Sequence, residues 1–343
     1  MRRTRARRSS SLAVAALCAL QAPAPKPAEP TYPWELQPLD AIYGHLSEGR
    51  FQEPVGVFFE PGAHELYVAD SKNGLIGIFN QERTPLFAFG GPALLVEPHA
   101  LQVLPDGTIF VLDALQTELR CFNYRGEIRA PLSFARPGAG PDSSEPVHLK
   151  AFVRAPDGRW FVADQEKQGD HLLLFDRERK FVRELAPSKK AGEYHAISDL
   201  ALSPSGKLAV VDQQGTPAIH VYDARGELLA AFGVRDVGLK DFTAPIAIGF
   251  DEQEFLYAVD LLKHDVKIFT VKGEYLERFG GWNTPETRGR APGEMLYPTD
   301  IAIAPGGDVY VSERFGGRVQ VFTRKPKPEP KPRPGAAPGA PRR

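Results

Sequence analysis

The sequence is poor in cysteine, with only Cys18 and Cys121 among its 343 residues. Cys18 falls in an apolar N-terminal run that we expect the mature protein to lose, so Cys121 would have no partner for an intramolecular disulfide. Residues 119–122 are typical of a strand, and we expect Cys121 to be a buried packing residue rather than a reactive thiol. A disulfide-stapled scaffold and a Cys/His zinc finger are thereby excluded.

The sequence also lacks an N-terminal apolar run long enough to span a bilayer comfortably. The run at residues 12–20 follows five arginines, a pattern typical of a secretory signal peptide. We therefore predict a signal peptide at residues 1–20, a secreted or periplasmic (cell-envelope) location, and no stable membrane span after its removal. An uncleaved anchor, a twin-arginine route through Arg7 and Arg8, and a lipoprotein site at Cys18 are the alternatives.

Several functional motifs are missing. No P-loop, dinucleotide-binding fingerprint or nucleophile elbow occurs in the sequence. The overall net charge is −1, but outside the basic N-terminus and the basic C-terminal tail the chain carries a net charge of about −12. This acidic body disfavours nucleic acid as a partner.

One short pattern returns six times along the chain. It is an apolar strand that ends on an acid, and the six acids are Asp70, Asp113, Asp164, Asp212, Asp260 and Glu313. They are separated by 43, 51, 48, 48 and 53 residues, a spacing expected of propeller blades.

Each repeat contains four short strand signals, often with a Pro-Asp-Gly turn or a relative of it between the first two. The third strand of every repeat ends on an aromatic residue, which we interpret as packing between neighbouring sheets. The sixth repeat lacks a fourth strand, and residues 38–44 have the matching pattern. The sequence therefore predicts an all-β fold: a six-bladed β-propeller of four-stranded antiparallel blades, with the last blade closed by an N-terminal strand.

The predicted propeller occupies residues 34–323. A Pro/Ala-rich linker is expected at residues 21–33, and a Pro/Lys/Arg-rich tail at residues 324–343 is expected to be disordered because it has almost nothing apolar to bury.

Two units carry a family resemblance: "FQEPVGVFFEPGAHELYVADSKNGLIGIF" and "YPTDIAIAPGGDVYVSERFGGRVQVF". They resemble NHL repeats, and the resemblance covers residues 36–322, most clearly in repeats one, two and six. It implies a six-bladed propeller, in a family whose members include binding scaffolds and a few enzymes.

Binding residues are expected on one face of the disc. The turns between second and third strands and the connections between blades emerge there, together with insertions at residues 135–146, 165–170 and 281–295. The last insertion offers an aromatic residue and hydrogen-bond donors. The predicted ligand-binding residues are Trp282, Asn283, Arg288 and Arg290.

The six repeated acids are interpreted as structural. One acid per blade at a strand end can accept hydrogen bonds from its own turn, whereas catalytic carboxylates are expected at one unique place.

A metal site is the main alternative. Three histidines stand near the starts of innermost strands in consecutive repeats, namely His99, His148 and His195, and three histidines with an open position suit zinc. NHL-like peptidyl-hydroxyglycine amidating lyases are similar in placing zinc histidines at inner-strand starts. That pattern puts the histidine six residues before the hairpin proline, which fits His99, but Lys150 and Ser198 occupy the equivalent positions in the next two repeats.

Two acids are candidate catalytic groups. Asp199 and Asp300 lie on predicted innermost strands, where burial would raise their pKa, and the structural alternative is a hydrogen bond to neighbouring backbone.

Taken together, the sequence predicts an exported, monomeric, non-enzymatic propeller that needs no cofactor and binds a protein, peptide or glycan on its insertion-bearing face. The alternative is a metal-assisted lyase or hydrolase that holds zinc or calcium. An architectural envelope component anchored by its N-terminus is a third possibility.

Overall fold

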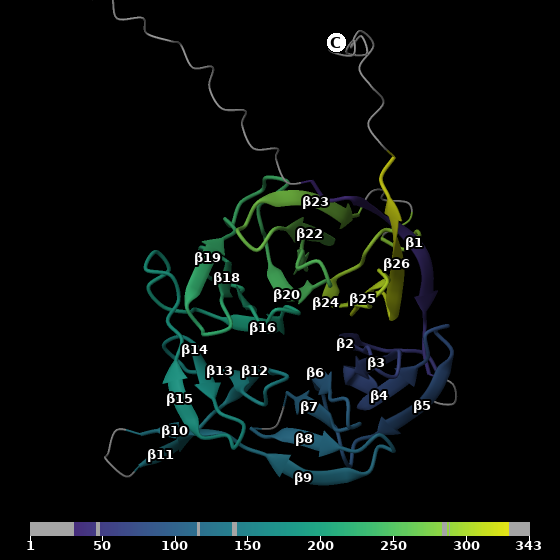
Figure 1. The fold of residues 1–343 in the computed structure, drawn as a ribbon. Helices are drawn as coiled ribbons and strands as arrows, with labels where there is room; N and C mark the ends of the chain where they lie inside the picture. The colour runs from purple at the N-terminus through teal and green to yellow at the C-terminus, as the bar shows by residue number, and fades with distance from the viewer. Residues whose placement is uncertain are drawn as a thin grey trace, which may run out of the picture. The chain divides into compact units, whose positions relative to one another are not determined.

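Six four-stranded antiparallel sheets are arranged around a common axis in the computed structural model (Figure 1). The structure describes residues 31–45, 49–114, 117–138, 143–282, 287 and 289–328. The predicted signal peptide, most of the linker and the C-terminal part of the tail lie outside these residues. Among the described residues, no helix has both the length and the apolar character needed to cross a membrane.

The blades follow one another along the chain, each from an innermost to an outermost strand. Blade 1 consists of β2 (Pro54–Glu60), β3 (Glu65–Asp70), β4 (Leu75–Phe79) and β5 (Pro85–Gly90). Blade 2 consists of β6 (Pro98–Val103), β7 (Ile109–Asp113), β8 (Leu119–Phe122) and β9 (Ile128–Leu132). Blade 3 consists of β12 (Leu149–Arg154), β13 (Trp160–Asp164), β14 (His171–Phe175) and β15 (Phe181–Glu184).

The second half of the ring repeats this order. Blade 4 consists of β16 (Ile197–Leu202), β17 (Leu208–Asp212), β18 (Ile219–Tyr222) and β19 (Leu228–Phe232). Blade 5 consists of β20 (Pro245–Phe250), β21 (Leu256–Asp260), β22 (Asp265–Phe269) and β23 (Tyr275–Gly280). Blade 6 consists of β24 (Pro298–Ile303), β25 (Val309–Glu313), β26 (Arg318–Pro326) and the N-terminal β1 (Trp34–Ile42).

The ring closes as the sequence predicts, because β1 pairs antiparallel with β26 as the outermost strand of blade 6. The closing strand pair is longer than the sequence predicts, because β1 begins at Trp34 and β26 extends to Pro326. Trp34 pairs with Pro326, and the Tyr32 hydroxyl lies 2.5 Å from the hydroxyl of Tyr257 in blade 5. Arg324 bonds Asp251 at 2.8 Å. Tyr32 and Arg324 therefore belong to the folded body, beyond the boundaries predicted at residues 34 and 323.

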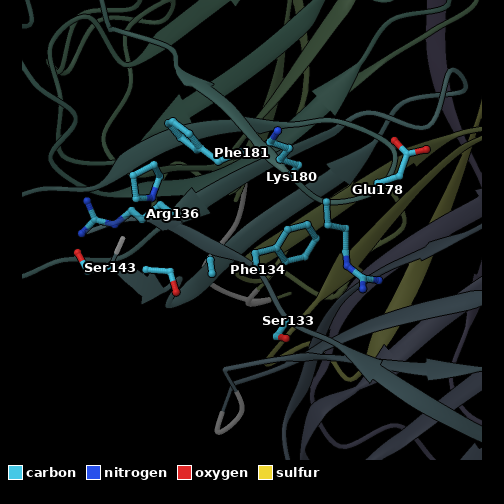
Figure 2. Close-up of a pocket in the computed structure, with 11 residues that line it drawn as sticks. Ser133, Phe134, Arg136, Ser143, Glu178, Lys180 and Phe181 are labelled. Carbon is cyan, nitrogen blue, oxygen red and sulfur yellow. The ribbon is translucent and has the colours of Figure 1, made fainter. Parts of the chain in front are cut away.

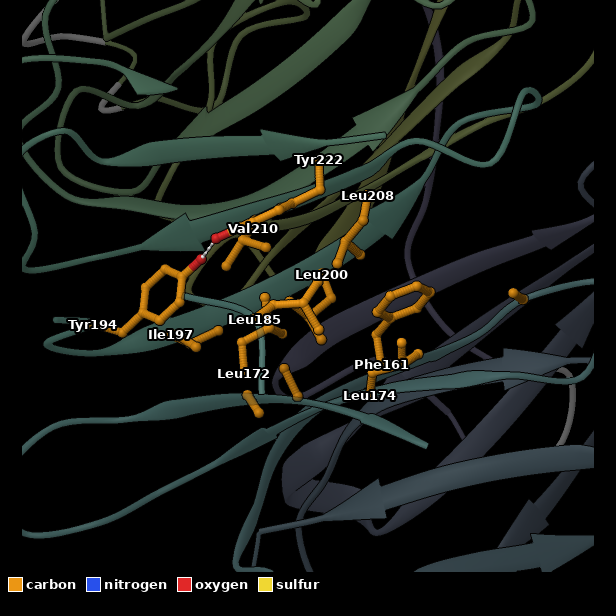
Figure 3. Close-up of a cluster of buried hydrophobic side chains, with 13 residues drawn as sticks. Phe161, Leu172, Leu174, Leu185, Tyr194, Ile197, Leu200, Leu208, Val210 and Tyr222 are labelled. Atoms are coloured by element: carbon orange, nitrogen blue, oxygen red, sulfur yellow. Dashed lines mark hydrogen bonds between the residues drawn. The ribbon is translucent and has the colours of Figure 1, made fainter. Parts of the chain in front are cut away.

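Neighbouring blades pack through aromatic and aliphatic side chains. The aromatic residues at the third-strand ends are all buried: Phe79, Phe122, Phe175, Tyr222, Phe269 and Phe322. Figure 3 shows the layer between blades 3 and 4, where Phe161 and Leu174 face Leu200 and Leu208. The hydroxyl of Tyr222 is satisfied by Tyr194 and by the carbonyl of Ala186. Burial of this kind supplies most of the favourable free energy of folding.

Every innermost strand contains a β-bulge at its second residue. These six bulge residues, one per blade, are Val55, His99, Lys150, Ser198, Ile246 and Thr299. A bulge places an extra side chain outside the regular alternation, so these positions form an equivalent set near the starts of the six strands.

Two small elements lie outside the blades. A single 3-10 turn, η1 (Ser71–Asn73), follows β3. The hairpin of β10 (Ala135–Pro137) and β11 (Ser144–Pro146) projects from the rim of the ring beside blade 3 (Figure 1). The described parts of the insertion at residues 135–146 therefore lie at the rim rather than over the axis.

The closing strand yields the first testable prediction. Ile42 is 6% exposed, whereas Leu39 on the same strand is 48% exposed. Ile42→Ala should lower the free energy of unfolding by about 2–5 kcal/mol because it removes buried methyl groups, and Leu39→Ala should change it by less than about 0.5 kcal/mol. Urea denaturation measures both. Equal midpoints for the two variants would mean that β1 does not take part in cooperative unfolding.

Candidate functional site

The six repeated acids are buried where each second strand ends. Asp212 illustrates their contacts, since its two carboxylate oxygens accept the backbone N–H groups of His195 at 3.0 Å and Ala196 at 2.9 Å. Corresponding bonds reach Asp70, Asp113, Asp164, Asp260 and Glu313. Asp212 also accepts the N–H of Gly215 in its own turn. The acids therefore fasten the segment leading into each innermost strand, in addition to the local turn that the sequence predicted.

The side-chain partners of these acids differ from blade to blade. Lys267 is fully buried, with its Nζ 3.2 Å from Asp260 and 2.5 Å from Asp265. Arg136 lies 3.0 Å from Asp164, and His45 lies 3.4 Å from Asp70. Buried carboxylates of this kind are stable only when paired or hydrogen-bonded, and these are both.

Glu313 stands where the other blades have aspartate, and its partner Arg318 also contacts the insertion beside it. Its Oε1 accepts from Arg318 at 2.9 Å. Arg318 also donates to the carbonyls of Gly289, Arg290 and Glu294 at 3.0, 3.1 and 2.9 Å. The C-terminal part of the insertion at residues 281–295 is thus fixed to the ring.

The three candidate zinc histidines occupy three different positions in the repeat. His99 is a bulge residue, equivalent to Lys150 and Ser198. The carbonyl of His148 accepts the N–H of Gln165, as the carbonyl of Ala196 accepts that of Gln213 in the next blade, and His195 precedes that position by one residue. The strand registers therefore place His99, Lys150 and Ser198 at equivalent positions, as predicted by counting back from the hairpin proline of each repeat.

The geometry does not bring these histidines to one point. The His148 and His195 side chains are 60% and 44% exposed, and they lie 3.9 and 3.5 Å from the acids of their own blades. Within the described part of the chain, no group of three His, Cys, Asp or Glu side chains is placed to hold a metal ion. The residues present therefore do not fit the His₃ site of the sequence-based alternative.

Asp199 and Asp300 lie on the axial strands and connect blades. Asp199 accepts the N–H of Leu200 and of Ile248 in blade 5, each at 2.8 Å. Asp300 likewise accepts from Ile301 at 2.7 Å and from Val57 of blade 1 at 2.8 Å. The predicted hydrogen bonds to neighbouring backbone are present in both cases.

Burial raises the pKa of Asp199 to about 7. It raises the pKa of Asp300 well above its usual range, and the charge of Asp199 adds to that shift. Both residues keep some exposure to solvent. Acids of this kind can hold a proton near neutral pH, which is the requirement for a general acid.

Blades 2 and 3 are connected differently. Their innermost strands, β6 and β12, lie farther apart than the other neighbouring innermost strands. Gln102 spans the distance, donating to the carbonyl of Arg154 at 2.9 Å and accepting its N–H at 2.7 Å. Burial lowers the pKa of His99, and the positive charge of Lys150 acts in the same direction. Lys150 and Ser198 are thus polar residues near the axis, at the positions equivalent to His99. In the sequence they stand out only because they are not histidines.

Trp282 belongs to a row of rings that the sequence did not reveal. Its ring centroid lies 5.2 Å from that of His264, which lies 4.7 Å from Tyr297, which in turn lies 5.1 Å from Phe315. Successive ring planes are nearly perpendicular, at 78°, 79° and 88°. We call these four residues the aromatic row. Arg290 is exposed on the adjacent segment, whereas Asn283 and Arg288 lie outside the described residues.

The aromatic row lies where blades 5 and 6 meet, with His264 in the turn between β21 and β22 and Phe315 in the turn between β25 and β26. Trp282 follows the outermost strand β23, and Tyr297 precedes the innermost strand β24. His264 is its buried centre, 8% exposed, and its Nδ1 accepts the N–H of Tyr297 at 3.0 Å. This bond requires an unprotonated Nδ1, and burial lowers the pKa of His264 accordingly. Trp282 and Phe315 are 45% and 60% exposed.

A separate hollow of about 530 Å³ lies at the base of the β10–β11 hairpin (Figure 2). Phe134, Arg136 and Ser143 line it from the hairpin side, and Lys180 and Phe181 line it from blade 3. The hollow is wide open to solvent. The guanidinium of Arg136, which lines it, is paired with the carboxylate of Asp164. The hollow brings together none of the predicted site residues.

The acid–cation contacts give a prediction for blade 5. Asp260→Ala should destabilise the protein by about 3–5 kcal/mol, because it removes a partner of the buried Lys267 and the acceptor of three backbone hydrogen bonds. The exposed Glu178→Ala serves as the control and should leave the urea midpoint nearly unchanged. A small effect of Asp260→Ala would contradict the assigned role of these acids.

The axial carboxyls predict a dependence of stability on pH. Between about pH 4 and pH 7 the unfolded chain releases protons that folded Asp199 and Asp300 retain, so these groups make stability fall as pH rises. In the double variant Asp199→Asn/Asp300→Asn, the fall over this window should be smaller than in the wild type. Urea denaturation at several pH values tests this, and identical slopes would contradict it.

Comparisons with known proteins support the fold. No family model matches the chain, and no curated protein matches it. Among solved structures, virginiamycin B lyase from Staphylococcus aureus is 15% identical with a TM-score of 0.52, covering 84% of this chain and 99% of its own. A luciferin-regenerating enzyme is 14% identical with a TM-score of 0.56, covering 83% and 95%. A putative gluconolactonase is 17% identical with a TM-score of 0.57, covering 85% and 95%.

At these identities the likeness concerns the fold alone. NHL-repeat membership remains a prediction that rests on the repeat sequences. What the comparisons establish is that this chain is a six-bladed β-propeller, with structural neighbours that include enzymes.

Proposed function

We propose that this protein is a binding propeller whose ligand, a protein, peptide or glycan, contacts the aromatic row between blades 5 and 6. The observation that carries the proposal is the row itself, in which Trp282 and Phe315 are exposed on either side of the better-buried His264 and Tyr297. Large aromatic side chains held in fixed positions at a protein surface are typical anchors of binding interfaces.

The surroundings of the row support a binding role. Arg318 and Glu313 fix the segment at residues 289–294, and Lys263 donates to the carbonyls of Gly238 and Asp241 at 2.6 Å each. Segments held in this way lose little conformational freedom when a ligand binds, which favours affinity.

We further propose that the propeller is exported, acts as a monomer and needs no cofactor for binding. The basic and apolar pattern of residues 1–20 supports export. The acidic body argues against a nucleic-acid ligand.

A lyase or hydrolase centred on the axis is the second candidate. It is favoured by the raised pKa values of Asp199 and Asp300 and by structural neighbours that are enzymes. In this function one of the two carboxyls would act as general acid. A metal-assisted version would need ligands other than a His99, His148 and His195 triad, and stoichiometric zinc or calcium in the purified protein would favour it.

The binding proposal predicts the effect of two substitutions. Ligands selected from a glycan array and a displayed peptide library should bind Trp282→Ala and Phe315→Ala at least about tenfold more weakly than the wild type, because each substitution removes an exposed anchor. Tyr124→Ala, at an exposed tyrosine in a turn of blade 2, is the matched control and should bind normally. Selected ligands that bind all three variants equally well would place the binding site elsewhere.

A further inference from the structure

We propose that the ligand of the aromatic row is an extended, proline-rich peptide in the polyproline II conformation. This inference rests on the binding function proposed above and specifies its ligand class. It follows from the spacing of the rings, from one tyrosine hydroxyl that bonds no other group in the described part of the chain, and from the chemistry of the surface beside the row.

The ring spacing fits the repeat of a polyproline II helix. Each ring centroid lies about 5 Å from the next, so alternate rings are at most ~10 Å apart. A polyproline II helix has three residues per turn and rises about 3.1 Å per residue, so residues i and i+3 lie on one side about 9 Å apart. Prolines at i and i+3 can therefore meet Trp282 and Tyr297, with the buried His264 between them.

The exposure of the rings suits such a ligand. Trp282 is 45% exposed and Phe315 is 60% exposed, while Tyr297 is partly buried and has a left-handed backbone with φ of 54°. Nearly perpendicular neighbouring rings form steps rather than one flat platform. Compact five-membered proline rings can pack into such steps, and aromatic-lined surfaces are the usual partners of polyproline II peptides.

The hydroxyl of Tyr297 provides a directional contact. Within the described part of the chain, this hydroxyl makes no hydrogen bond, and the contacts of Tyr297 are made by its ring and its backbone. Polyproline II peptides have no internal backbone hydrogen bonds, so their carbonyl oxygens are free to accept one from a tyrosine.

The surface beside the row offers apolar contact for a peptide. Val237, Leu239 and Leu262 are 91%, 67% and 51% exposed on the adjoining loop and turn, where Arg235, Asp236 and Lys240 are exposed as well. Lys263 is bonded to two carbonyls and Arg314 lies 2.8 Å from Glu53, whereas Arg290 is exposed. A proline-rich peptide needs apolar contact and a few donors, which these side chains supply.

Isothermal titration calorimetry with defined probes tests the inference. Decaproline should bind the full-length protein, and a ten-residue Gly-Ser peptide should not. Trp282→Ala and Phe315→Ala should each weaken decaproline binding at least tenfold, and Tyr297→Phe should weaken it severalfold while leaving the rings in place. Tyr124→Ala is the control with unchanged affinity. Urea denaturation verifies that each variant is folded, and Tyr297→Phe keeps the test valid should an alanine variant fail to fold.

The outcomes separate the ligand class from the binding function. Trp282-dependent binding of an oligosaccharide such as chitohexaose, without binding of decaproline, would overturn the peptide assignment and leave the proposed function standing. Decaproline binding that is insensitive to all three row substitutions would overturn the location of the site. Failure of decaproline, chitohexaose and library-selected ligands to bind in a Trp282-dependent way would overturn both proposals.

Discussion

The structure depends on one repeated interaction: a buried acid at the end of each second strand accepts backbone hydrogen bonds from the segment that leads into the innermost strand. In blade 4 this acid is Asp212, which holds His195 and Ala196. Without such a bond, the backbone N–H groups of this segment would need other hydrogen-bond acceptors beside the buried end of the second strand. The interaction therefore sets where each blade begins and which side chains stand at the ring's face.

Asymmetry enters through the partners of these acids. Asp260 forms an ion pair with Lys267, Asp164 with Arg136, and Glu313 with Arg318. In blade 6 the longer glutamate and the arginine extend the interaction to an insertion, whose carbonyls Arg318 binds. A contact that stabilises the ring thus also fixes the segment beside Trp282, and the scaffold and the proposed binding surface become parts of one network.

The axis of the ring is connected by side chains as well as by packing. Asp199 joins blade 4 to blade 5, Asp300 joins blade 6 to blade 1, and Gln102 joins blade 2 to blade 3. The two aspartates were candidate catalytic groups, and their raised pKa values keep that function open. Their backbone hydrogen bonds give them a structural role in any case, so a loss of activity on substitution must be separated from a loss of stability.

The sequence by itself determined the architecture, because strand signals, hairpin turns and buried third-strand aromatics such as Phe79 depend on local physics repeated six times. It also identified Trp282 as a candidate binding residue and gave the correct register for His99 against Lys150 and Ser198. Only the tertiary structure placed Trp282 in a row with His264, Tyr297 and Phe315. These residues come from blades 5 and 6, and nothing in the sequence around each of them indicates a shared surface. Such contacts leave no periodic signal in the chain, because Trp282 and Tyr297 come from the connection between β23 and β24, whereas His264 and Phe315 come from turns within blades 5 and 6.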